Sequence, residues 1–434
     1  MKTMLLFGAG KSATSLIRYL IDVCSAREWQ LTVADTDLNL ALSKIGTAPS
    51  AKAVCLDAGD TTARDALVAS ADIVISLLPP SLHYQVALSC LKNNRHLLTA
   101  SYLDGPIRAL EPAIREKGLL FLGEMGLDPG IDHMSALQMV RRIQAEGGHI
   151  RRFFSHTGGL VAPDSDNNPW RYKISWNPRN VVMAGAAGAT YRENNRVVTR
   201  GYSALFEEPG QVSLSGIGTL AWYPNRDSLA YIPLYGLEEA GTFIRTTLRY
   251  PAYCRAWSAI VNAGLTDDKT PVDPTGLSYA AWSTALVPLV NTDNREQLEF
   301  LGLFGPSLVP QSARTSADIL QHLLETRLAM APADKDMIVM IHELDVEQKG
   351  KTYSARSTLV VKGEDSLHTA MARTVGLPLG IAAVLVLDGR IPLTGLHIPI
   401  LPAIYEPVLE QLERQGIRFE HSVTPHATPP NTPS

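Results

Sequence analysis

The stretch MLLFGAGKSA, residues 4–13, decides the fold of this chain. A short apolar strand precedes Gly8-x-Gly10-x-x-Ala13, and a helix is expected to follow. In that setting the first glycine makes a tight turn, the second lets the backbone approach a pyrophosphate, and the small third residue allows close helix packing. The phosphate would lie at the helix N-terminus, where backbone amides are available. The stretch therefore predicts a dinucleotide site.

Apolar strands alternate with helical segments along residues 1–123. The strands are expected at residues 4–7, 31–34, 53–56, 72–78, 96–100 and 118–123. They lack the polar–apolar alternation of half-exposed strands, which is what a parallel sheet covered on both faces requires. We therefore predict an α/β protein whose N-terminal part is a doubly wound, parallel Rossmann sheet.

Past residue 130 the pattern changes to that of a mixed α/β domain. Strands are expected at 153–160 and 211–217, and an antiparallel pair at 336–342 and 356–361. Residues 252–333 have a helical period, which indicates a helical insertion. Helices are also expected at 366–375, 377–387 and 404–415; the last is amphipathic and is expected to return to the first domain.

These segments predict a division into domains. The dinucleotide-binding domain takes residues 1–127 and about 398–421. The substrate-binding α/β domain takes residues 128–251 and about 334–397, with the helical insertion 252–333 as a third part. Residues 424–434 hold four prolines among polar residues, so this tail is expected to be disordered.

Composition excludes several classes of protein. The 39 Lys and Arg against 43 Asp and Glu give a net charge of −4, without the basic footprint of a nucleic-acid or anionic-membrane binder. The first apolar run ends at Gly8, too early for a membrane span or a signal peptide. Four widely spaced cysteines indicate reduced thiols and a cytoplasmic location. His342-Glu343 lacks the second histidine of a zinc-protease motif, so no metal site is predicted.

Asp35 ends the second predicted strand, 22 residues after Ala13. A carboxylate there accepts hydrogen bonds from both ribose hydroxyls and repels a 2′-phosphate, which favours NAD, with NADP as the alternative cofactor. The competing interpretation is a solvated turn residue or the cap of the next helix, a role that Asp37 could take instead. Asp57, at the next strand end, is either an adenine contact or a simple helix cap.

The run GLDPGIDH, residues 126–133, follows the predicted sheet. Glycine and proline fix its backbone while two carboxylates and an imidazole stay available for chemistry. This combination indicates the place where a cofactor meets a substrate. His133 stands at a helix start, where we interpret it as a structural histidine rather than a catalyst. His83 and His156 are weaker catalytic candidates still.

Several stiffened segments beyond residue 150 carry arginine and asparagine. They are Gly158–Pro163, Asp166–Pro169, Tyr172–Trp176, Tyr223–Ser228 and Arg245–Tyr250. Loops of this kind suit the recognition of carboxylates, because a guanidinium group binds them in a bidentate fashion. The alternative is a set of surface salt bridges, the commoner fate of a single arginine.

These motifs, with Ser101-Tyr102, closely resemble the saccharopine dehydrogenase family of the L-glutamate-forming type (saccharopine reductase), from the first strand to about residue 420. The resemblance implies a Rossmann domain completed by the C-terminal helix, a mixed α/β domain, a helical domain and a homodimer. It implies reversible oxidation of saccharopine to L-glutamate and α-aminoadipate semialdehyde in lysine metabolism. The implied substrate contacts are Ser101, Tyr102, Asp128, Arg226, Thr247, Leu248 and Arg249. The cofactor contacts are Gly8, Gly10, Lys11, Ser12, Ala13, Asp35, Asp57, Ser76, Leu77, Ala100, Leu127, Asp128 and Trp176.

Saccharopine carries three carboxylates and a secondary amine, so a site with two or more arginines is expected. Tyr102 and Asp128 are the candidates for holding the amine and passing protons, with hydrogen bonding that only positions the substrate as the alternative. Thr157 and Val161 replace a cysteine and a proline usual in the family. Trp170 replaces a common leucine beside the substrate loop and is expected to reshape the pocket.

Two other functions are compatible with these motifs. One is a related imine reductase acting on a different amine and semialdehyde, as carboxynorspermidine dehydrogenase does; a substrate with fewer carboxylates would leave Arg226 or Arg249 without a partner. The other is a non-enzymatic dinucleotide sensor or scaffold, which would be expected to have lost such site residues.

Overall fold

The computed structural model describes residues 1–426. The chain forms two compact units, each built from separate stretches of sequence. Unit 1 comprises Met1–Arg142 and Ala370–Arg418, and unit 2 comprises Ile143–Thr369 and the segment that starts at Phe419.

Unit 1 contains a parallel sheet of seven strands in the order β16-β6-β5-β4-β1-β2-β3. The strands are β1 (Thr3–Phe7), β2 (Gln30–Asp35), β3 (Ala51–Cys55), β4 (Ile73–Ser76), β5 (His96–Thr99), β6 (Leu120–Leu122) and β16 (Gly395–His397). All neighbours are parallel. The order reverses at β1, which confirms the predicted doubly wound sheet and puts a switch point at its carboxyl edge.

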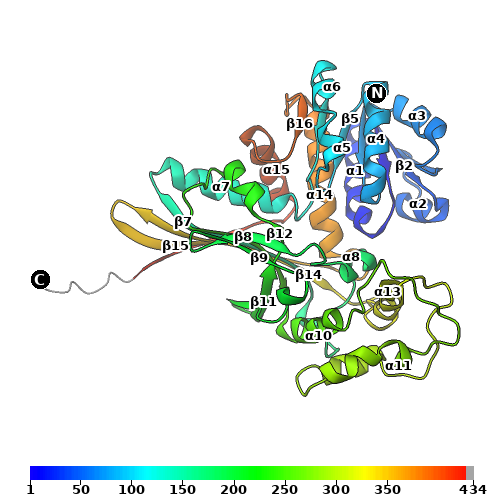
Figure 1. Ribbon diagram of the computed structural model, residues 1–434. Helices are drawn as coiled ribbons and strands as arrows, with labels where there is room; N and C mark the ends of the chain where they lie inside the picture. Colours follow the sequence, from blue (N-terminus) through cyan, green and yellow to red (C-terminus); the bar gives the residue numbers. More distant parts are fainter. Residues whose placement is uncertain (427–434) are drawn as a thin grey trace, which may run out of the picture. The chain divides into compact units, whose positions relative to one another are not determined.

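Unit 1 also contains helices, several of which flank the sheet (Figure 1). They are α1 (Thr14–Arg27), α2 (Leu38–Ile45), α3 (Thr61–Ala69), α4 (Pro80–Asn93), α5 (Gly105–Arg108), α6 (Glu111–Glu116), α7 (Ile131–Ala145), α14 (Ala370–Leu387) and α15 (Pro402–Arg414), with a 3₁₀ turn at Lys11–Ala13 before α1. As predicted, the amphipathic helix α15 belongs with the N-terminal sheet, in unit 1.

The predicted boundary before residue 398 is wrong, because α14 belongs to unit 1. The two helices predicted at 366–375 and 377–387 form one continuous helix, α14. Two glycines allow α14 to lie close to α1: a Cβ on Gly376 would lie 2.9 Å from Leu16 Cβ, and one on Gly380 would lie 2.8 Å from Tyr19. α14 therefore packs directly on α1. It is long and apolar enough to cross a membrane, yet 78% of it is buried in the protein, as in a core helix.

Unit 2 is built on a mixed sheet of ten strands with β10-β11-β13-β7-β14-β15-β17 as its path. The strands are β7 (His149–Val161), β8 (Ala189–Glu193), β9 (Arg196–Arg200), β10 (Gly210–Leu214), β11 (Gly218–Pro224), β12 (Arg226–Asp227), β13 (Thr242–Arg249), β14 (Asp336–Gln348), β15 (Lys351–Lys362) and β17 (Glu420–Pro425). β14 and β15 pair antiparallel, which confirms that prediction.

Two predictions about unit 2 are wrong. Thr242–Arg249 is a central strand, β13, rather than a stiffened loop; it runs parallel to β7 and antiparallel to β11. Its residues are almost all buried, so it shows no alternating pattern. Thr424 and Pro425 belong to β17, which pairs with β15, and the His426 amide donates to the Thr352 carbonyl. The rest of the tail predicted as disordered lies outside the described residues.

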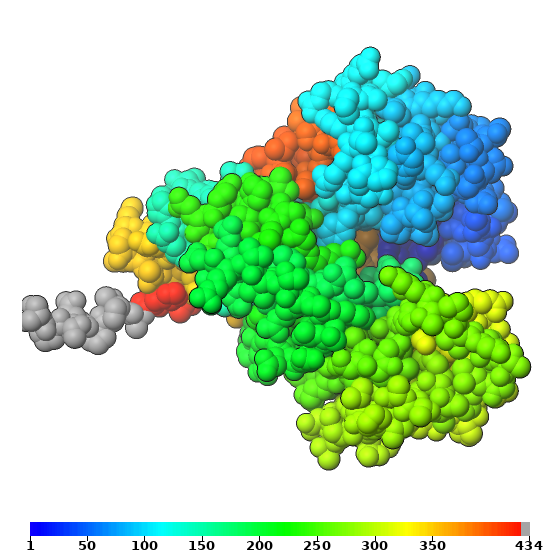
Figure 2. All heavy atoms as spheres, viewed as in Figure 1, coloured from blue at the N-terminus to red at the C-terminus, as the bar shows by residue number. Residues whose placement is uncertain are grey.

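The predicted insertion 252–333 is helical but forms no separate core. Its helices are α10 (Pro251–Asn262), α11 (Tyr279–Trp282), α12 (Arg295–Leu301) and α13 (Ser316–Arg327); α8 (Pro178–Val182) and α9 (Ile232–Tyr235) lie earlier in the unit. Trp257 and Leu320 from this region share one apolar cluster with Tyr191 and Ile244 from the strands. Figure 2 shows this yellow-green region in contact with the green part of the same unit.

Gly158 on β7 permits the close approach of β13. A Cβ added there would lie 2.6 Å from Leu248 Cβ and 2.8 Å from its carbonyl oxygen. We expect Gly158→Ala to destabilise unit 2 by about 2–3 kcal/mol, because the strands cannot separate without losing their hydrogen bonds. Urea unfolding followed by tryptophan fluorescence measures this. Gly201→Ala, where a Cβ would meet nothing within 4 Å, is the control and should change the unfolding free energy by less than about 0.5 kcal/mol.

Candidate active site

The glycine loop has the geometry that a dinucleotide requires. Gly8 has φ +96°, and a Cβ there would lie 3.0 Å from the Leu77 carbonyl oxygen, so the turn packs against the end of β4. A Cβ on Gly10 would meet nothing within 4 Å, so that face is open. Ala13 is fully buried beneath the loop. No described side chain caps the following helix start, which leaves its amides for a phosphate.

Asp35 lies beside this loop at the end of β2. Its carboxylate accepts hydrogen bonds from the Ala9 amide at 2.6 Å and from the Asp37 amide at 2.9 Å. Asp37 in turn caps α2 by accepting from the Leu40 amide at 3.0 Å. The helix-cap interpretation of Asp35 is therefore wrong, and its position is the one expected for a ribose-binding acid.

Lys44 is a neighbour of the loop that sequence reasoning missed. Its ammonium group donates to the Gly10 carbonyl and, at 2.9 Å, to Thr14 Oγ1. Burial lowers the pKa of Lys44 to about 8, and nearby Asp35 opposes that shift. Lys44 belongs to no motif, because only the fold brings the last turn of α2 to the loop.

The other candidate cofactor contacts of unit 1 lie at or just after the ends of its strands. Ser76 ends β4, and Leu77 and Ala100 directly follow β4 and β5. Asp57 is exposed and accepts from the Gly59 amide at 2.8 Å. Asp60 caps α3, so the helix-cap interpretation of Asp57 is wrong and its adenine contact stays a prediction.

The segment after β6 brings the two candidate catalytic groups together. The Met125 amide donates to the Thr99 carbonyl at 3.0 Å, which holds the segment against the end of β5. Gly130 has φ +145°, and a Cβ there would lie 2.1 Å from the Gly126 carbonyl oxygen, so only glycine fits. The Tyr102 hydroxyl donates to Asp128 Oδ1 at 3.1 Å, and both side chains are half-buried.

A buried polar network lies behind this pair. His133 Nε2 is 3.1 Å from Glu124 Oε2, and both side chains are almost fully buried. Asp132 accepts from the Gly130 amide at 2.6 Å. These contacts agree with a structural role for His133 and add Glu124, which sequence reasoning missed because it precedes the motif.

His83 contacts a predicted substrate residue. Its Nδ1 is 2.9 Å from Ser76 Oγ, and its Nε2 is 2.8 Å from Ser101 Oγ. Burial lowers the pKa of His83 to about 4, although Asp104 acts in the opposite direction. The imidazole is therefore neutral near pH 7.

In unit 2 the key residue is Arg249, whose side chain is 3% exposed. One nitrogen donates to the Leu248 carbonyl at 2.8 Å, and the guanidinium lies 5.3 Å from the rings of Tyr172 and Tyr253. Among residues 1–426 it forms no ion pair, and Arg249 Nε and the Tyr253 hydroxyl lack hydrogen-bond partners. Burial works against the charge, but the tyrosines hold the pKa of Arg249 above its usual value. In the described part of the chain, the guanidinium is thus a buried cation without a counter-ion.

The strands of unit 2 set the positions of the other candidate substrate contacts. Thr247 on β13 lies beside Thr157 on β7 and opposite Tyr223 on β11. Arg226 is exposed and opens β12 at φ +52°. Arg245 is buried against the Tyr231 ring, 4.5 Å from its centroid, whereas Arg249 lies beside the Tyr172 and Tyr253 rings.

Two tryptophans differ from expectation. Trp170 is fully buried, donates to the Gln297 carbonyl at 2.6 Å and packs on Trp257, so it belongs to the core rather than to a pocket wall. Trp176 donates to the Tyr172 hydroxyl at 3.1 Å. It lies in unit 2, whereas the other cofactor candidates lie in unit 1.

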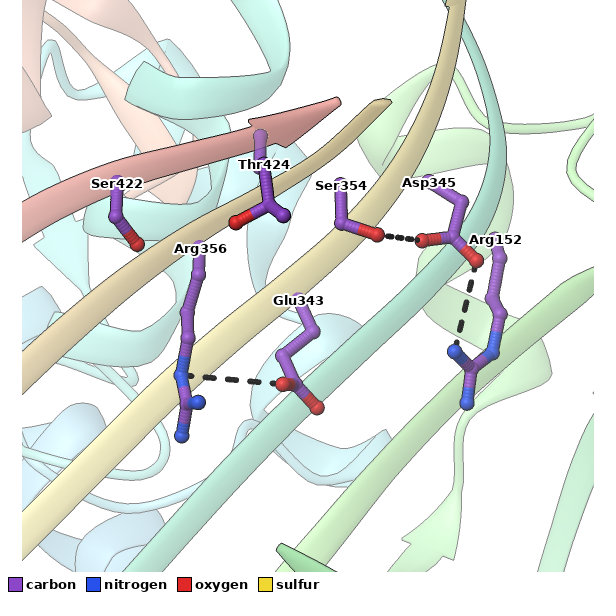
Figure 3. A pocket seen from close by; sticks show the side chains of 8 residues that line it. Arg152, Glu343, Asp345, Ser354, Arg356, Ser422 and Thr424 are labelled. Atoms are coloured by element: carbon purple, nitrogen blue, oxygen red, sulfur yellow. Dashed lines mark hydrogen bonds and ion pairs between the residues drawn. The ribbon is translucent and has the colours of Figure 1, made fainter. Parts of the chain in front are cut away.

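A separate pocket lies over strands of unit 2 (Figure 3). It is lined by Arg152, Glu343, Asp345, Ser354, Ala355, Arg356, Ser422 and Thr424. Its charges are paired internally: Arg152 lies 3.5 Å from Asp345, and Arg356 lies 3.8 Å from Glu343. The pocket contains none of the predicted site residues and no excess charge.

Within residues 1–426, no cluster of His, Cys, Asp or Glu is arranged to hold a metal ion.

Known proteins resemble this chain along its length. Residues 4–122 match the saccharopine dehydrogenase NADP binding domain, and residues 126–417 match the saccharopine dehydrogenase C-terminal domain. The chain is 32% identical to saccharopine dehydrogenase [NADP(+), L-glutamate-forming] of Schizosaccharomyces pombe, over 98% of this chain and 99% of that one. It is 35% identical to the mitochondrial alpha-aminoadipic semialdehyde synthase of Bos taurus, over 96% of this chain and 47% of that one.

The chain thus spans about half the length of the semialdehyde synthases that it matches. A solved structure, apo saccharopine dehydrogenase (L-Glu forming) from Saccharomyces cerevisiae, superposes with a TM-score of 0.86 at 31% identity, over 98% of this chain and all of that one. Together with the domain matches, these similarities show that the chain belongs to the saccharopine dehydrogenase family.

Proposed function

We propose that this chain is a saccharopine dehydrogenase of the L-glutamate-forming type, in lysine metabolism. It would interconvert saccharopine with L-glutamate and α-aminoadipate semialdehyde. The observation that carries the proposal is Arg249, a buried cation without a counter-ion in the part of the chain described here. A buried guanidinium of this kind calls for a ligand carboxylate, and saccharopine has three. The names of the relatives support the same substrate.

Unit 1 supplies the groups that handle the reacting nitrogen. When bound, the oxidised nicotinamide would accept a hydride from the carbon beside the secondary amine. Asp128 accepts the proton of the substrate ammonium, so the nitrogen lone pair is free as the C–H bond breaks and a substrate imine forms. Tyr102, which donates to Asp128, holds that carboxylate in place. After water adds to the imine carbon, the C–N bond breaks and the same pair returns a proton to the glutamate nitrogen.

Asp35 sets the choice of nucleotide in this proposal. The family domain is described as NADP binding and the yeast relatives are named for NADP(+), so similarity supports NADP. The Asp35 carboxylate, held by the Ala9 amide, favours NAD because it repels a 2′-phosphate. We expect kcat/KM to be higher with NAD than with NADP, and Asp35→Ala to shift the ratio toward NADP about tenfold or more. Equal use of both cofactors by the wild type would contradict this.

A steady-state assay with saccharopine and either nucleotide tests the function itself. The proposal expects absorbance of the reduced nicotinamide to rise, with L-glutamate released in equal amount. No rise with saccharopine would reject the proposal. Turnover only in the reductive direction, with a polyamine precursor in place of glutamate, would identify the imine reductase instead. Nucleotide binding without any turnover would identify a sensor.

A further inference from the structure

His83 is held on both sides by hydroxyl groups at the carboxyl edge of the unit 1 sheet. It lies in the first turn of α4 and is 2% exposed. Ser76, at the end of β4, is fully buried, and its hydroxyl contacts His83 Nδ1 at 2.9 Å. Ser101, just after β5, is half-buried and contacts His83 Nε2 at 2.8 Å. The imidazole therefore lies between the fully buried Ser76 hydroxyl and the half-buried Ser101 hydroxyl.

The buried protons decide the tautomer of this histidine. A neutral imidazole has one N–H and one acceptor nitrogen. Among residues 1–426 the Ser76 hydroxyl has His83 Nδ1 as its hydrogen-bond partner, so donation of its proton to Nδ1 satisfies this buried group. His83 Nε2 then carries the hydrogen and donates it to Ser101 Oγ. Thr99 Oγ1 also contacts His83 Nε2, but at 3.4 Å against 2.8 Å for Ser101 Oγ, so Ser101 is the closer acceptor.

We propose that His83 is a positioning residue for Ser101: it fixes the serine oxygen as an acceptor and so turns the serine proton outward, toward an acceptor oxygen of the substrate. This assignment builds on the proposed function, in which Ser101 contacts saccharopine. A carboxylate oxygen has only acceptor capacity, and the pre-oriented serine hydroxyl has the matching donor. Without His83 the serine hydroxyl could rotate, and its proton could turn inward.

A double-mutant cycle tests whether His83 acts through Ser101. His83→Asn keeps an amide near Nδ1 for Ser76 and removes the contact with Ser101. His83→Gln, the matched variant, places an amide near Nε2 and can still donate to the serine. We expect His83→Asn to lower kcat/KM for saccharopine about tenfold, the loss of one hydrogen bond, while His83→Gln keeps most of the activity. In a Ser101→Ala background, His83→Asn should cost less than about twofold.

Equal losses for His83→Asn in both backgrounds would overturn the proposal, because they would show that His83 supports the fold rather than Ser101. The KM for the nucleotide and the thermal midpoint of each variant separate damage to the fold from loss of positioning. A KM for saccharopine that rises with little change in kcat is the pattern expected of substrate positioning.

A second measurement does not depend on turnover. Long-range ¹H–¹⁵N spectra of the full chain labelled at histidine report the tautomer of each ring, and the signal lost in His83→Asn belongs to His83. We expect a neutral ring with hydrogen on Nε2 from pH 5 to pH 8. Hydrogen on Nδ1, or titration within that range, would overturn the assignment. If the wild type fails to oxidise saccharopine, the proposed function fails and these spectra still decide the tautomer.

Discussion

Replacing Arg249 by methionine is expected to lower kcat/KM for saccharopine about 10³-fold, the largest effect foreseen for any single change. Truncating one partner of a buried, hydrogen-bonded charge pair costs about 2–5 kcal/mol, and within residues 1–426 Arg249 is the cation that lies beside the Tyr172 and Tyr253 rings. Methionine keeps the apolar length of the side chain. The loss should appear mainly in the KM for saccharopine, measured at saturating nucleotide.

Stability gives the matching control for Arg249. Without substrate the guanidinium has no counter-ion within residues 1–426, so Arg249→Met should leave the thermal midpoint unchanged or raise it. Arg151→Met is the comparison variant: Arg151 is a half-exposed arginine paired with Glu347 at 2.8 Å. It should change kcat/KM less than about twofold. A lowered midpoint in Arg249→Met, with equal loss of nucleotide binding, would show that the arginine serves the fold instead.

Asp128→Asn is expected to lower kcat about 10²–10³-fold with little change in the KM for nucleotide. The amide fills the same space and can still accept from the Tyr102 hydroxyl, but it cannot take the substrate proton. The measurement is kcat at saturating saccharopine and nucleotide for wild type and variant, with the KM for nucleotide as the control.

Tyr102→Phe separates the two roles considered for this pair. If tyrosine only holds Asp128 in place, its loss should cost about tenfold in the wild type and almost nothing in the Asp128→Asn background. An effect of Asp128→Asn confined to a higher KM for saccharopine, with kcat intact, would reduce Asp128 to a positional hydrogen bond and contradict its proton-transfer role.

The dinucleotide unit was largely predictable, because its signals are local. The apolar run before Gly8, the glycine spacing and Asp35 at a strand end each need only neighbouring residues, and the sheet puts them where ligands bind. The sequence pattern places α14 in the wrong unit, because an apolar helix has the same composition whichever core it packs against. Its partner, Leu16, lies more than 350 residues earlier.

The substrate side was less predictable for a related reason. β13 is buried on both faces, so Thr242–Arg249 lacks the alternation that identifies a strand, and its two arginines looked like a loop cluster. The structure gives them different surroundings: Arg245 packs on the Tyr231 ring, whereas Arg249 lies beside the Tyr172 and Tyr253 rings and forms no ion pair among residues 1–426. Whether a charge has a partner depends on contacts between distant segments, which spacing does not encode.

The split sequence of unit 1 has a consequence for protein synthesis. The face of α1 that Gly376 and Gly380 cover stays bare until Ala370–Arg418 leaves the ribosome, after all of residues 143–369 have emerged. A nascent chain that stops before Ala370 therefore leaves this face of α1 open to chaperones and proteases.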